Sequence, residues 1–189
     1  MLLDIPHYDQ NDNDTHLHGP GYRQCFKTSV AMMLEGVLNG GLSHLAKRNN
    51  MAEPESYYGY HLAEYGDTTK AGPHINCLRE VFKVDASFIQ NASLQDIKDQ
   101  LALGYGVPVG LHYKSSGHWV CVVGWDEESK VFTVNDPYGI REGSSNRYKV
   151  IGNYSGRHDT YSEPLMLKLF SGSCDNDGWM IQVKGMLDG

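Results

Sequence analysis

The sequence predicts an α+β fold in which helices fill the first half of the chain and a meander of β-strands follows. Apolar residues recur at helical spacing after residue 25, whereas short, Val-rich runs bounded by Gly, Asp or Pro occupy residues 107–135. Helices followed by strands, without regular alternation, favour this class over a parallel sheet of βαβ units. A length of 189 residues suits one domain, so we expect a single domain over residues 1–189.

Each element is placed by its residue spacing and by the turn residues around it. In the stretch 25–38 only Lys27 and Glu35 are charged, which predicts a helix buried nearly all round. Ser93 and Asp96 form a capping-box signature at the start of a later helix. The complete expected order is an extended entry 1–8, a loop 9–24, helices 25–38, 43–66 and 73–82, a strand 84–89, a helix ending at Gly104, strands 107–113, 118–125 and 131–135, a loop over most of 139–164, a helix 165–170 and a strand 178–183.

Composition and charge argue against several classes of protein. The formal net charge of −7 argues against nucleic-acid binding and gives no attraction to anionic membranes or cell-wall polymers. No stretch approaches the ~20 apolar residues that a membrane-spanning helix needs, so we expect no membrane insertion. The first ten residues, MLLDIPHYDQ, lack a cationic leader, so we expect no signal peptide and a location in the cytoplasm of the producing cell. We also expect a monomer without a cofactor.

The four cysteines, Cys25, Cys77, Cys121 and Cys174, are spread along the chain with no close pairing and no C-x-x-C motif. This spacing argues against a disulfide framework and fits a reducing compartment. Cys77 and Cys121 lie in apolar stretches, which is typical of small buried side chains. Cys25 differs, because it stands where a polar loop runs into an apolar helix.

The context of Cys25 suits a nucleophile. A helix N-terminus and a neighbouring imidazolium both favour the thiolate, which is the reactive form of cysteine. Gly19, Pro20 and Gly21 keep the preceding backbone in a loop, so the amides of the first helical turn should face the sulfur. The alternative is one more small buried residue, and the choice depends on finding a base and a carboxylate elsewhere in the chain.

A histidine and an aspartate occur at the ends of two predicted strands. Side chains alternate between faces along a strand, so Cys121 points away from His118, which heads the same strand. A hairpin through 126–130 would bring Asp136 beside His118, where a carboxylate can fix the imidazole tautomer. Asn135 is an alternative orienting residue on the opposite side, and Asp136 could instead belong to an ordinary Asp-Pro turn. The other histidines have looser contexts and are expected to be ordinary surface or core residues: His7, His16, His18, His44, His61, His74, His112 and His158.

The combination of these motifs resembles the papain-like cysteine peptidases, in particular the double-glycine leader peptidases. Proteins of this type carry an early glutamine, a cysteine that heads the first helix, a G-H-[FW]-V-x-V-x-G strand and an Asp-Pro turn. The corresponding stretches here are HYDQND, CFKTSVAMML, GHWVCVVG and NDPYG. The resemblance implies a papain-like fold, with an N-terminal helical part packed on an antiparallel sheet that carries the His and the Asp. It also implies Cys25 as nucleophile, His118 as base, Asp136 as orienting carboxylate and Gln10 as the oxyanion-hole side chain.

Two departures from the family pattern concern the nucleophile and the oxyanion hole. Phe26 follows the cysteine, where the family often has glycine. The interval between Gln10 and Cys25 is long, because NDNDTHLHGPGYR comes between HYDQ and the QC pair. Gln24, directly before the cysteine, is therefore a competing candidate for the oxyanion hole, although its side chain would have to fold back.

A narrower similarity concerns the substrate. IPHYDQNDN, RQCFKTSVAMML, the GDTT stretch 66–69, the GHW strand and NDPYG together resemble peptidase-like proteins of tailed bacteriophages, some assigned as endolysins that cut peptidoglycan cross-links. The resemblance implies a cysteine peptidase that is made in the infected cell and acts on a peptide or peptidoglycan substrate. Two alternatives stay open. One is a thiol-dependent acyl or peptidyl transferase or a protein-processing peptidase, and the other is a non-catalytic phage structural module.

The acidic loop raises a metal hypothesis that its spacing does not support. Asp and Asn occupy positions 9 and 11–14, but the EF-hand template requires Gly at its sixth position, which holds Asp14 when counted from Asp9. His16 and His18 lack further ligands at zinc spacing. We therefore expect a solvated loop at the edge of the cleft and no metal.

Overall fold

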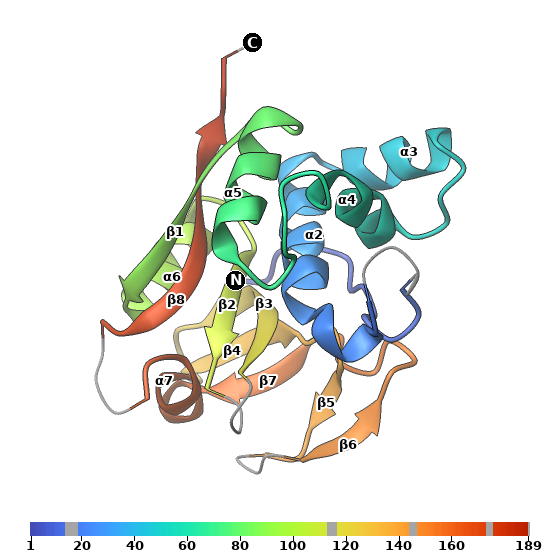
Figure 1. Ribbon diagram of the computed structural model, residues 1–189. Helices are drawn as coiled ribbons and strands as arrows, with labels where there is room; N and C mark the ends of the chain where they lie inside the picture. Colours follow the sequence, from blue (N-terminus) through green and yellow to red (C-terminus); the bar gives the residue numbers. More distant parts are fainter. Residues whose placement is uncertain (14–18, 113–116, 144–146, 173–175, 189) are drawn as a thin grey trace.

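A six-stranded antiparallel sheet lies between two groups of helices (Figure 1). The computed structural model describes residues 1–13, 19–112, 117–143, 147–172 and 176–188. The helices are η1 (Gly21–Arg23), α2 (Cys25–Val37), α3 (Gly41–Arg48), α4 (Pro54–Leu62), α5 (Ala71–Glu80), α6 (Leu94–Ala102) and α7 (Glu163–Phe170). The strands are β1 (Val84–Ala92), β2 (Val107–Leu111), β3 (His118–Asp126), β4 (Val131–Asn135), β5 (Gly139–Arg141), β6 (Tyr148–Ile151), β7 (Asp159–Ser162) and β8 (Gly178–Met186). The expected α+β class is confirmed.

The sheet has the strand order β1-β8-β2-β3-β4-β7, and each neighbouring pair is antiparallel. The expected meander of β2, β3 and β4 is confirmed, and the C-terminal strand β8, whose place the sequence did not indicate, lies between β1 and β2. Strands β3 and β4 form the expected hairpin, with Val122 opposite Val134 and a bulge between Val122 and Gly124. The N-terminal segment runs beside this bulge, where Leu2 forms a bridge with Gly124.

The two faces of the sheet belong to two hydrophobic cores. Cys121 and Val123 of β3 lie in the core formed with helices α2 to α5. Val120 and Val122 of the same strand lie in the core formed with α6 and α7. The predicted alternation of faces along this strand is therefore confirmed. Burial on both faces removes apolar surface from water, which is the dominant favourable term in folding.

Helix α2 forms the centre of the first of these cores. Its residues from Phe26 to Glu35 are all buried, as its apolar sequence predicts. The two charged side chains within it have partners: Lys27 Nζ donates to Gln24 Oε1 at 2.6 Å, and Glu35 Oε2 accepts from Ser43 N–H at 2.9 Å. Such partners are necessary because a charge loses its hydration when it is buried, and the partners compensate for that loss.

Two other sequence predictions need correction. The stretch 43–66 contains two separate helices, α3 and α4, because Asn50 adopts a left-handed backbone conformation and Pro54 begins a new helix. The stretch 139–164 is not mostly loop, since it contains β5 and β6, which pair with each other, and β7, which completes the main sheet. These strands have three or four residues each, too few for an alternating pattern to emerge among Gly, Ser and Asn. Position 113 and residues 14–18 of the loop 9–24 lie outside the described residues.

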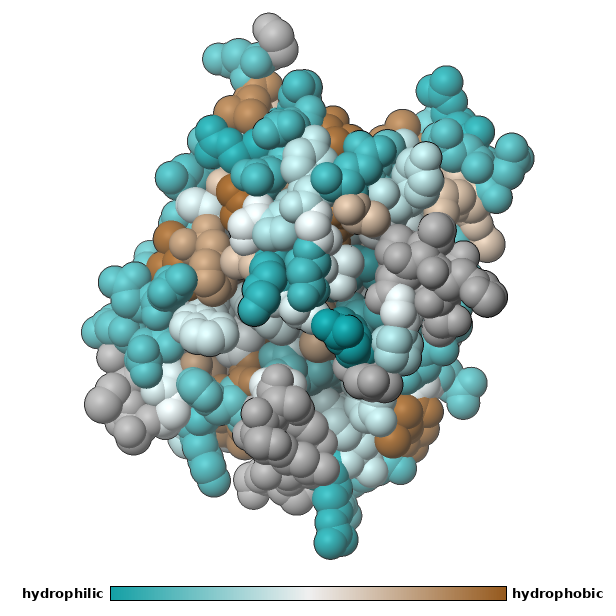
Figure 2. All heavy atoms as spheres, in the orientation of Figure 1, coloured by the Kyte–Doolittle hydropathy of each residue, from teal (hydrophilic) through white to brown (hydrophobic). Residues whose placement is uncertain are grey.

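Hydrophilic residues cover most of the face shown in Figure 2, and apolar residues occur there in small separate groups. Large apolar side chains that are exposed come from different parts of the chain, as Tyr60, Tyr154 and Trp179 do. Each helix within the described ranges is too short or too polar to cross a membrane.

We expect Ser93→Ala to lower the free energy of unfolding by about 1 kcal/mol. The capping box at the start of α6 is complete, because Ser93 Oγ accepts from Asp96 N–H at 3.3 Å and Asp96 Oδ2 accepts from Ser93 N–H at 2.7 Å. Alanine removes the first acceptor. Urea unfolding followed by circular dichroism measures the change. Gln95→Ala, at an exposed position of the same helix, is the control and should change the value by less than about 0.5 kcal/mol. Equal effects of the two variants would contradict the capping role.

Candidate active site

Cys25 is the first residue of α2, and its side chain is half-buried and not in a disulfide. Gln24 precedes it as the N-cap residue. The first N–H groups of an α-helix have no partner within the helix and carry partial positive charge. The backbone around Cys25 therefore offers donors to a negative charge at or beside the sulfur, as the sequence predicts.

The β3–β4 hairpin brings a histidine and an aspartate together. His118 begins β3, and Asp136 directly follows the last residue of β4. His118 Nε2 lies 2.8 Å from Asp136 Oδ1, so the ring N–H donates to the carboxylate. The side chain of Cys25 lies beside the same imidazole and contributes to raising its pKa. The structure thus brings together Cys25, His118 and Asp136, the three residues that the sequence singles out.

The Asp136 carboxylate is completely buried and accepts four hydrogen bonds from the described residues. Besides His118, the donors are Tyr138 N–H at 2.9 Å, Tyr148 O–H at 2.9 Å and Tyr161 O–H at 3.3 Å. These donors replace the water that burial removes, and hydrogen bonds to an ionised group are stronger than neutral ones. The arrangement therefore stabilises the charged form of the carboxylate.

A close backbone approach holds the turn that carries Asp136. Asp136 N–H donates to Gly156 O at 2.9 Å, and a Cβ on Gly156 would lie 2.0 Å from Asp136 O. A side chain at position 156 would therefore push the two backbones apart. Glycine at this position allows the segment after β6 to pack directly against the turn after β4.

The charges of the imidazole and the carboxylate stabilise each other. Burial alone would lower the pKa of His118, but the Asp136 carboxylate and the Cys25 side chain outweigh this effect and raise it to about 10. Burial alone would raise the pKa of Asp136, but the charge and hydrogen bond of His118, with the tyrosine donors, hold it below its usual value. At neutral pH the imidazole is therefore protonated, and an imidazolium beside a thiol favours the thiolate.

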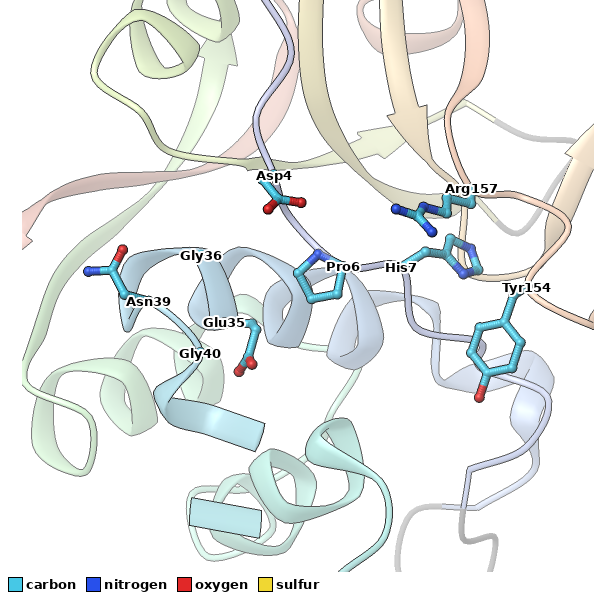
Figure 3. A pocket seen from close by; sticks show the side chains of 9 residues that line it. All are labelled: Asp4, Pro6, His7, Glu35, Gly36, Asn39, Gly40, Tyr154 and Arg157. Carbon is cyan, nitrogen blue, oxygen red and sulfur yellow. The ribbon is translucent and has the colours of Figure 1, made fainter. Parts of the chain in front are cut away.

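His7 supports the Asp136 turn from the N-terminal segment. Its Nε2–H donates to the Asp136 carbonyl oxygen at 2.7 Å, and burial lowers its pKa, so the ring is neutral at pH 7. His7 also lines a cleft of about 720 Å³, together with Asp4, Glu35 and Arg157 (Figure 3). Cys25 and His118 are not among the residues that line this cleft.

Phe26, which follows the cysteine, packs between two aromatic rings. Its ring stacks on Trp119 with centroids 3.7 Å apart and planes within 8°, and its centroid lies 4.0 Å from that of His74. Trp119 directly follows His118, so the stack joins the residue after the thiol to the residue after the imidazole. An aromatic pair contributes ~0.5–1.5 kcal/mol beyond its burial. Phe26 thus fixes the start of α2 against β3, which explains how a bulky residue fits at this position.

His74 is a satisfied core residue, as its looser sequence context predicts. Its side chain is fully buried, with Nδ1 accepting from Tyr58 O–H at 2.7 Å and Nε2–H donating to Thr68 O at 2.9 Å. Burial lowers its pKa to about 4, so it is neutral in the folded protein. It therefore serves as a packing surface for the aromatic ring of Phe26.

Gln10 forms hydrogen bonds to the turn after Asp136 and to the loop before Cys25. Its backbone N–H donates to Pro137 O at 2.9 Å, in the turn after Asp136, and its side-chain Nε2 donates to Gly21 O at 2.8 Å, in the loop before the cysteine. A Cβ on Gly21 would lie 2.8 Å from Gln10 O, so the two backbones are in close contact. The long loop between Gln10 and Cys25 therefore returns to the site, and the Gln10 amide carries a second N–H beyond the one given to Gly21.

Gln24 has both of its amide atoms engaged in the loop. Its Nε2 donates to Gly19 O at 2.6 Å, and its Oε1 accepts from Lys27 Nζ at 2.6 Å. The side chain is completely buried. This arrangement compensates the buried ammonium of Lys27 and gives Gln24 a structural role at the helix start.

The remaining candidates from the sequence lie away from the imidazole. Burial raises the pKa of Cys77 to about 12 and also raises that of Cys121, so both are inert buried thiols, as expected. Asn135 is completely buried and bonds the backbone, with Nδ2 donating to Ile5 O at 3.1 Å and Oδ1 accepting from His158 N–H at 3.1 Å. It faces the side of Cys121, as strand alternation predicts. Cys174, His16 and His18 lie outside the described residues.

Sequence reasoning missed the groups that hold Asp136. Tyr148 begins β6 and Tyr161 lies in β7, two strands that the sequence analysis assigns to a loop. The alternation in YKVI was the available signal for the first of these strands, but four residues are too few to decide. His7 was expected to be an ordinary residue, because nothing local indicates that its partner is a backbone carbonyl far along the chain.

The helical N-terminal part, the antiparallel sheet and the cysteine at a helix start define a papain-like α+β fold. A sequence model of the Peptidase_C39 like family matches residues 2–163, most of the chain. The chain therefore belongs to the Peptidase C39-like family of cysteine peptidases.

One solved structure is similar over nearly its whole length. It is the crystal structure of a Bacillus anthracis protein described as a candidate C39-like peptidase, with 14% sequence identity and a TM-score of 0.48, and the match covers 99% of this chain and 98% of that one. No curated protein matches the sequence.

We expect Tyr148→Phe to shift the acid limb of Cys25 alkylation to higher pH by about one unit. The Tyr148 hydroxyl is one of the donors that hold the pKa of Asp136 down, so its loss makes the carboxylate easier to protonate as pH falls. Protonated Asp136 no longer stabilises the imidazolium beside the thiol. The rate of reaction with iodoacetamide, followed by mass spectrometry of the Cys25 peptide, measures the shift. Tyr60→Phe removes an exposed hydroxyl from α4 and should leave the profile unchanged; identical profiles for wild type and Tyr148→Phe would contradict the role of this donor.

Proposed function

We propose that the chain hydrolyses an amide bond with Cys25 as nucleophile, His118 as base and Asp136 as orienting carboxylate. The observation that carries this proposal is the position of the imidazole, which donates to a buried carboxylate and lies beside the Cys25 side chain that helps to raise its pKa. Membership of a cysteine peptidase family supports the reaction class. A binding or structural module would not need a carboxylate buried at the cost of its hydration.

In the first half of the reaction, His118 holds the proton of the Cys25 thiol and the thiolate attacks the carbonyl carbon of the scissile amide. The carbonyl oxygen becomes an oxyanion. The Cys25 backbone N–H and the second Nε2–H of Gln10 are the donors that we assign to it. The Asp136 carboxylate keeps the imidazolium charged and correctly oriented until the amide nitrogen needs a proton.

In the second half, the imidazolium gives its proton to the leaving amine as the C–N bond breaks. The remaining acyl group is then a thioester on Cys25. Water attacks this thioester, His118 takes a proton from the water, and the C–S bond breaks to release a carboxylic acid and the free thiol. The same two oxyanion donors serve both tetrahedral intermediates.

The substrate that we propose is a peptide of bacterial peptidoglycan, so that the protein would act as a bacteriophage endolysin. The support is the similarity of five stretches, from IPHYDQNDN to NDPYG, to peptidase-like proteins of tailed bacteriophages. In this proposal the protein is made in the cytoplasm of the infected cell and works on the cell wall as a monomer. The net charge of −7 gives no attraction to an anionic envelope, so recognition would depend on the peptide itself.

Cys25→Ala should abolish release of peptide fragments from purified peptidoglycan, because no other group can form the acyl intermediate. The measurement is mass analysis of soluble fragments after digestion of sacculi. Wild-type protein should produce new free amines and carboxylates in the stem or cross-bridge peptides. Cys77→Ala, which removes an inert thiol from the core, is the matched control and should keep the activity if it folds.

Different outcomes of this digestion separate the alternatives. Full activity of Cys25→Ala would contradict the thiol mechanism. Intact sacculi together with cleavage of a protein substrate would contradict the endolysin role and keep the peptidase. A product in which the acyl group has moved to an added amine would instead indicate a transferase.

Gln10→Ala should lower kcat by roughly 10²-fold with a much smaller effect on KM, the scale expected for one oxyanion-hole donor. The loss falls on kcat because the donor acts on charge that develops only in the transition state. Gln24→Ala is the comparison, and we expect it to lower stability, measured by urea unfolding, because it removes the buried Oε1 acceptor to which the Lys27 ammonium donates. A loss in kcat below about twofold for Gln10→Ala would remove Gln10 from the oxyanion hole.

A further inference from the structure

Three carboxylates from two separate segments converge beside the loop that carries Gln10. Asp12 comes from the acidic loop, Glu53 is the N-cap residue of α4, and Glu55 lies in the first turn of that helix. One carboxylate oxygen from each lies within 4.8 Å of the others. Acidic residues at a helix start are common because they complement the helix dipole. That effect does not explain why Asp12, from a different segment, joins them.

Glu55 supplies an independent reason to expect a ligand at this position. Its side chain is 1% exposed, and its Oε2 atom is buried without a hydrogen-bond partner. A buried carboxylate oxygen without a donor is costly, so such atoms are rare in folded proteins. One oxygen of this carboxylate therefore lacks a donor, and the side chain lies among two other carboxylates that would share a cation.

The charge around the cluster fits a divalent ion. Lys27 is the nearby cation that acts on Glu55, and its ammonium donates to Gln24 Oε1. With Glu55 ionised, the three carboxylates at −1 each outweigh the ammonium at +1, and Asp9 adds negative charge near Asp12. A divalent cation offsets more of this charge than a monovalent ion does.

The chemistry of the ligand atoms and their spacing indicate which kind of ion the cluster would bind. Carboxylate oxygens are hard ligands that suit Ca²⁺ and Mg²⁺ rather than Zn²⁺ or Cu²⁺. Ca²⁺ binds oxygen at about 2.3–2.6 Å, so opposite ligands lie about 4.6–5.2 Å apart, and it tolerates irregular geometry. Mg²⁺ needs about 2.0–2.1 Å and a nearly regular octahedron. Three donors on a loop and a helix, all within 4.8 Å of one another, suit the irregular geometry that Ca²⁺ accepts.

We propose that Asp12, Glu53 and Glu55 bind a Ca²⁺ ion that fastens the loop next to Gln10 to the start of α4. The same loop already has ties to Tyr154, whose O–H donates to Asp12 Oδ2 at 2.9 Å and whose N–H donates to Asp9 Oδ2 at 3.1 Å. In Figure 3 the Tyr154 hydroxyl points away from the cleft that the ring borders. The ion joins α4 to the contact between this loop and Tyr154. It thereby limits movement of the segment that carries the Gln10 side chain.

The test is calorimetric titration of CaCl₂ into chelator-treated protein at constant ionic strength of ~0.15 M, so that screening of the net charge does not change. We expect saturable binding, and a melting temperature that rises with the Ca²⁺ concentration because the ion binds the folded state. MgCl₂ should bind at least about tenfold more weakly. Neither readout requires peptidase activity, so the result is independent of the proposed reaction.

Glu55→Gln keeps the shape of the side chain but removes its charge, and we expect it to weaken Ca²⁺ binding by about tenfold or more. Asp12→Asn, at an exposed position, should do the same and covers the case in which the buried substitution prevents folding. Glu64→Gln, exposed just beyond the C-terminal end of α4 and outside the cluster, removes the same charge and should leave the affinity within about twofold. The proposal is overturned by wild-type affinity in Asp12→Asn or Glu55→Gln, by equal loss in Glu64→Gln, or by no saturable binding up to ~10 mM CaCl₂, above the range of weak extracellular calcium modules.

Discussion

The charge of one buried carboxylate, that of Asp136, organises the rest of the site. A carboxylate without exposed surface is stable only if donors replace its hydration. The chain supplies these donors from its own turn, from β6, from β7 and from the imidazole at the start of β3. His7 and Gly156 then hold the backbone of the same residue. Segments far apart in the sequence must therefore come together before this charge is tolerated, and the position of His118 follows from their assembly.

Cys25, the proposed nucleophile, is positioned by the packing of its helix. Helix α2 is buried along most of its length, so the position of Cys25 is set by the core beneath it. Phe26 and Trp119 stack face to face, which connects the residues that follow the thiol and the imidazole. A change in either ring would alter the distance between Cys25 and His118 without replacing either residue. The bulky residue in place of the family's common glycine thus strengthens the alignment of helix and strand.

Local sequence patterns predicted the elements whose structure depends mainly on neighbouring residues. Helix α2, the β3–β4 hairpin and the opposite facing of Cys121 follow from periodicities of 3.6 and 2, which are properties of neighbouring residues. The insertion of β8 between β1 and β2 and the pairing of β7 with β4 depend on distant segments, and no local pattern indicates them. The hydrogen bonds that hold Asp136 and the approach of Asp12 to Glu55 also depend on segments that are far apart in the sequence. The roles of Cys25, His118, Asp136 and Gln10, and the peptidoglycan substrate, stay predictions.

The most direct measurement of the central claim is an NMR titration of the His118 ring in reduced wild-type protein and in Asp136→Asn. The folded-state pKa of His118 is raised to about 10 by the carboxylate and the thiol, so the imidazolium should persist above neutral pH and lose its proton only as pH rises through that value. In Asp136→Asn, which stays similar in shape but carries no charge, deprotonation should begin at a clearly lower pH. A wild-type ring that titrates near the ordinary value of ~6.5, or an unchanged titration in the variant, would contradict the claim that Asp136 controls the site.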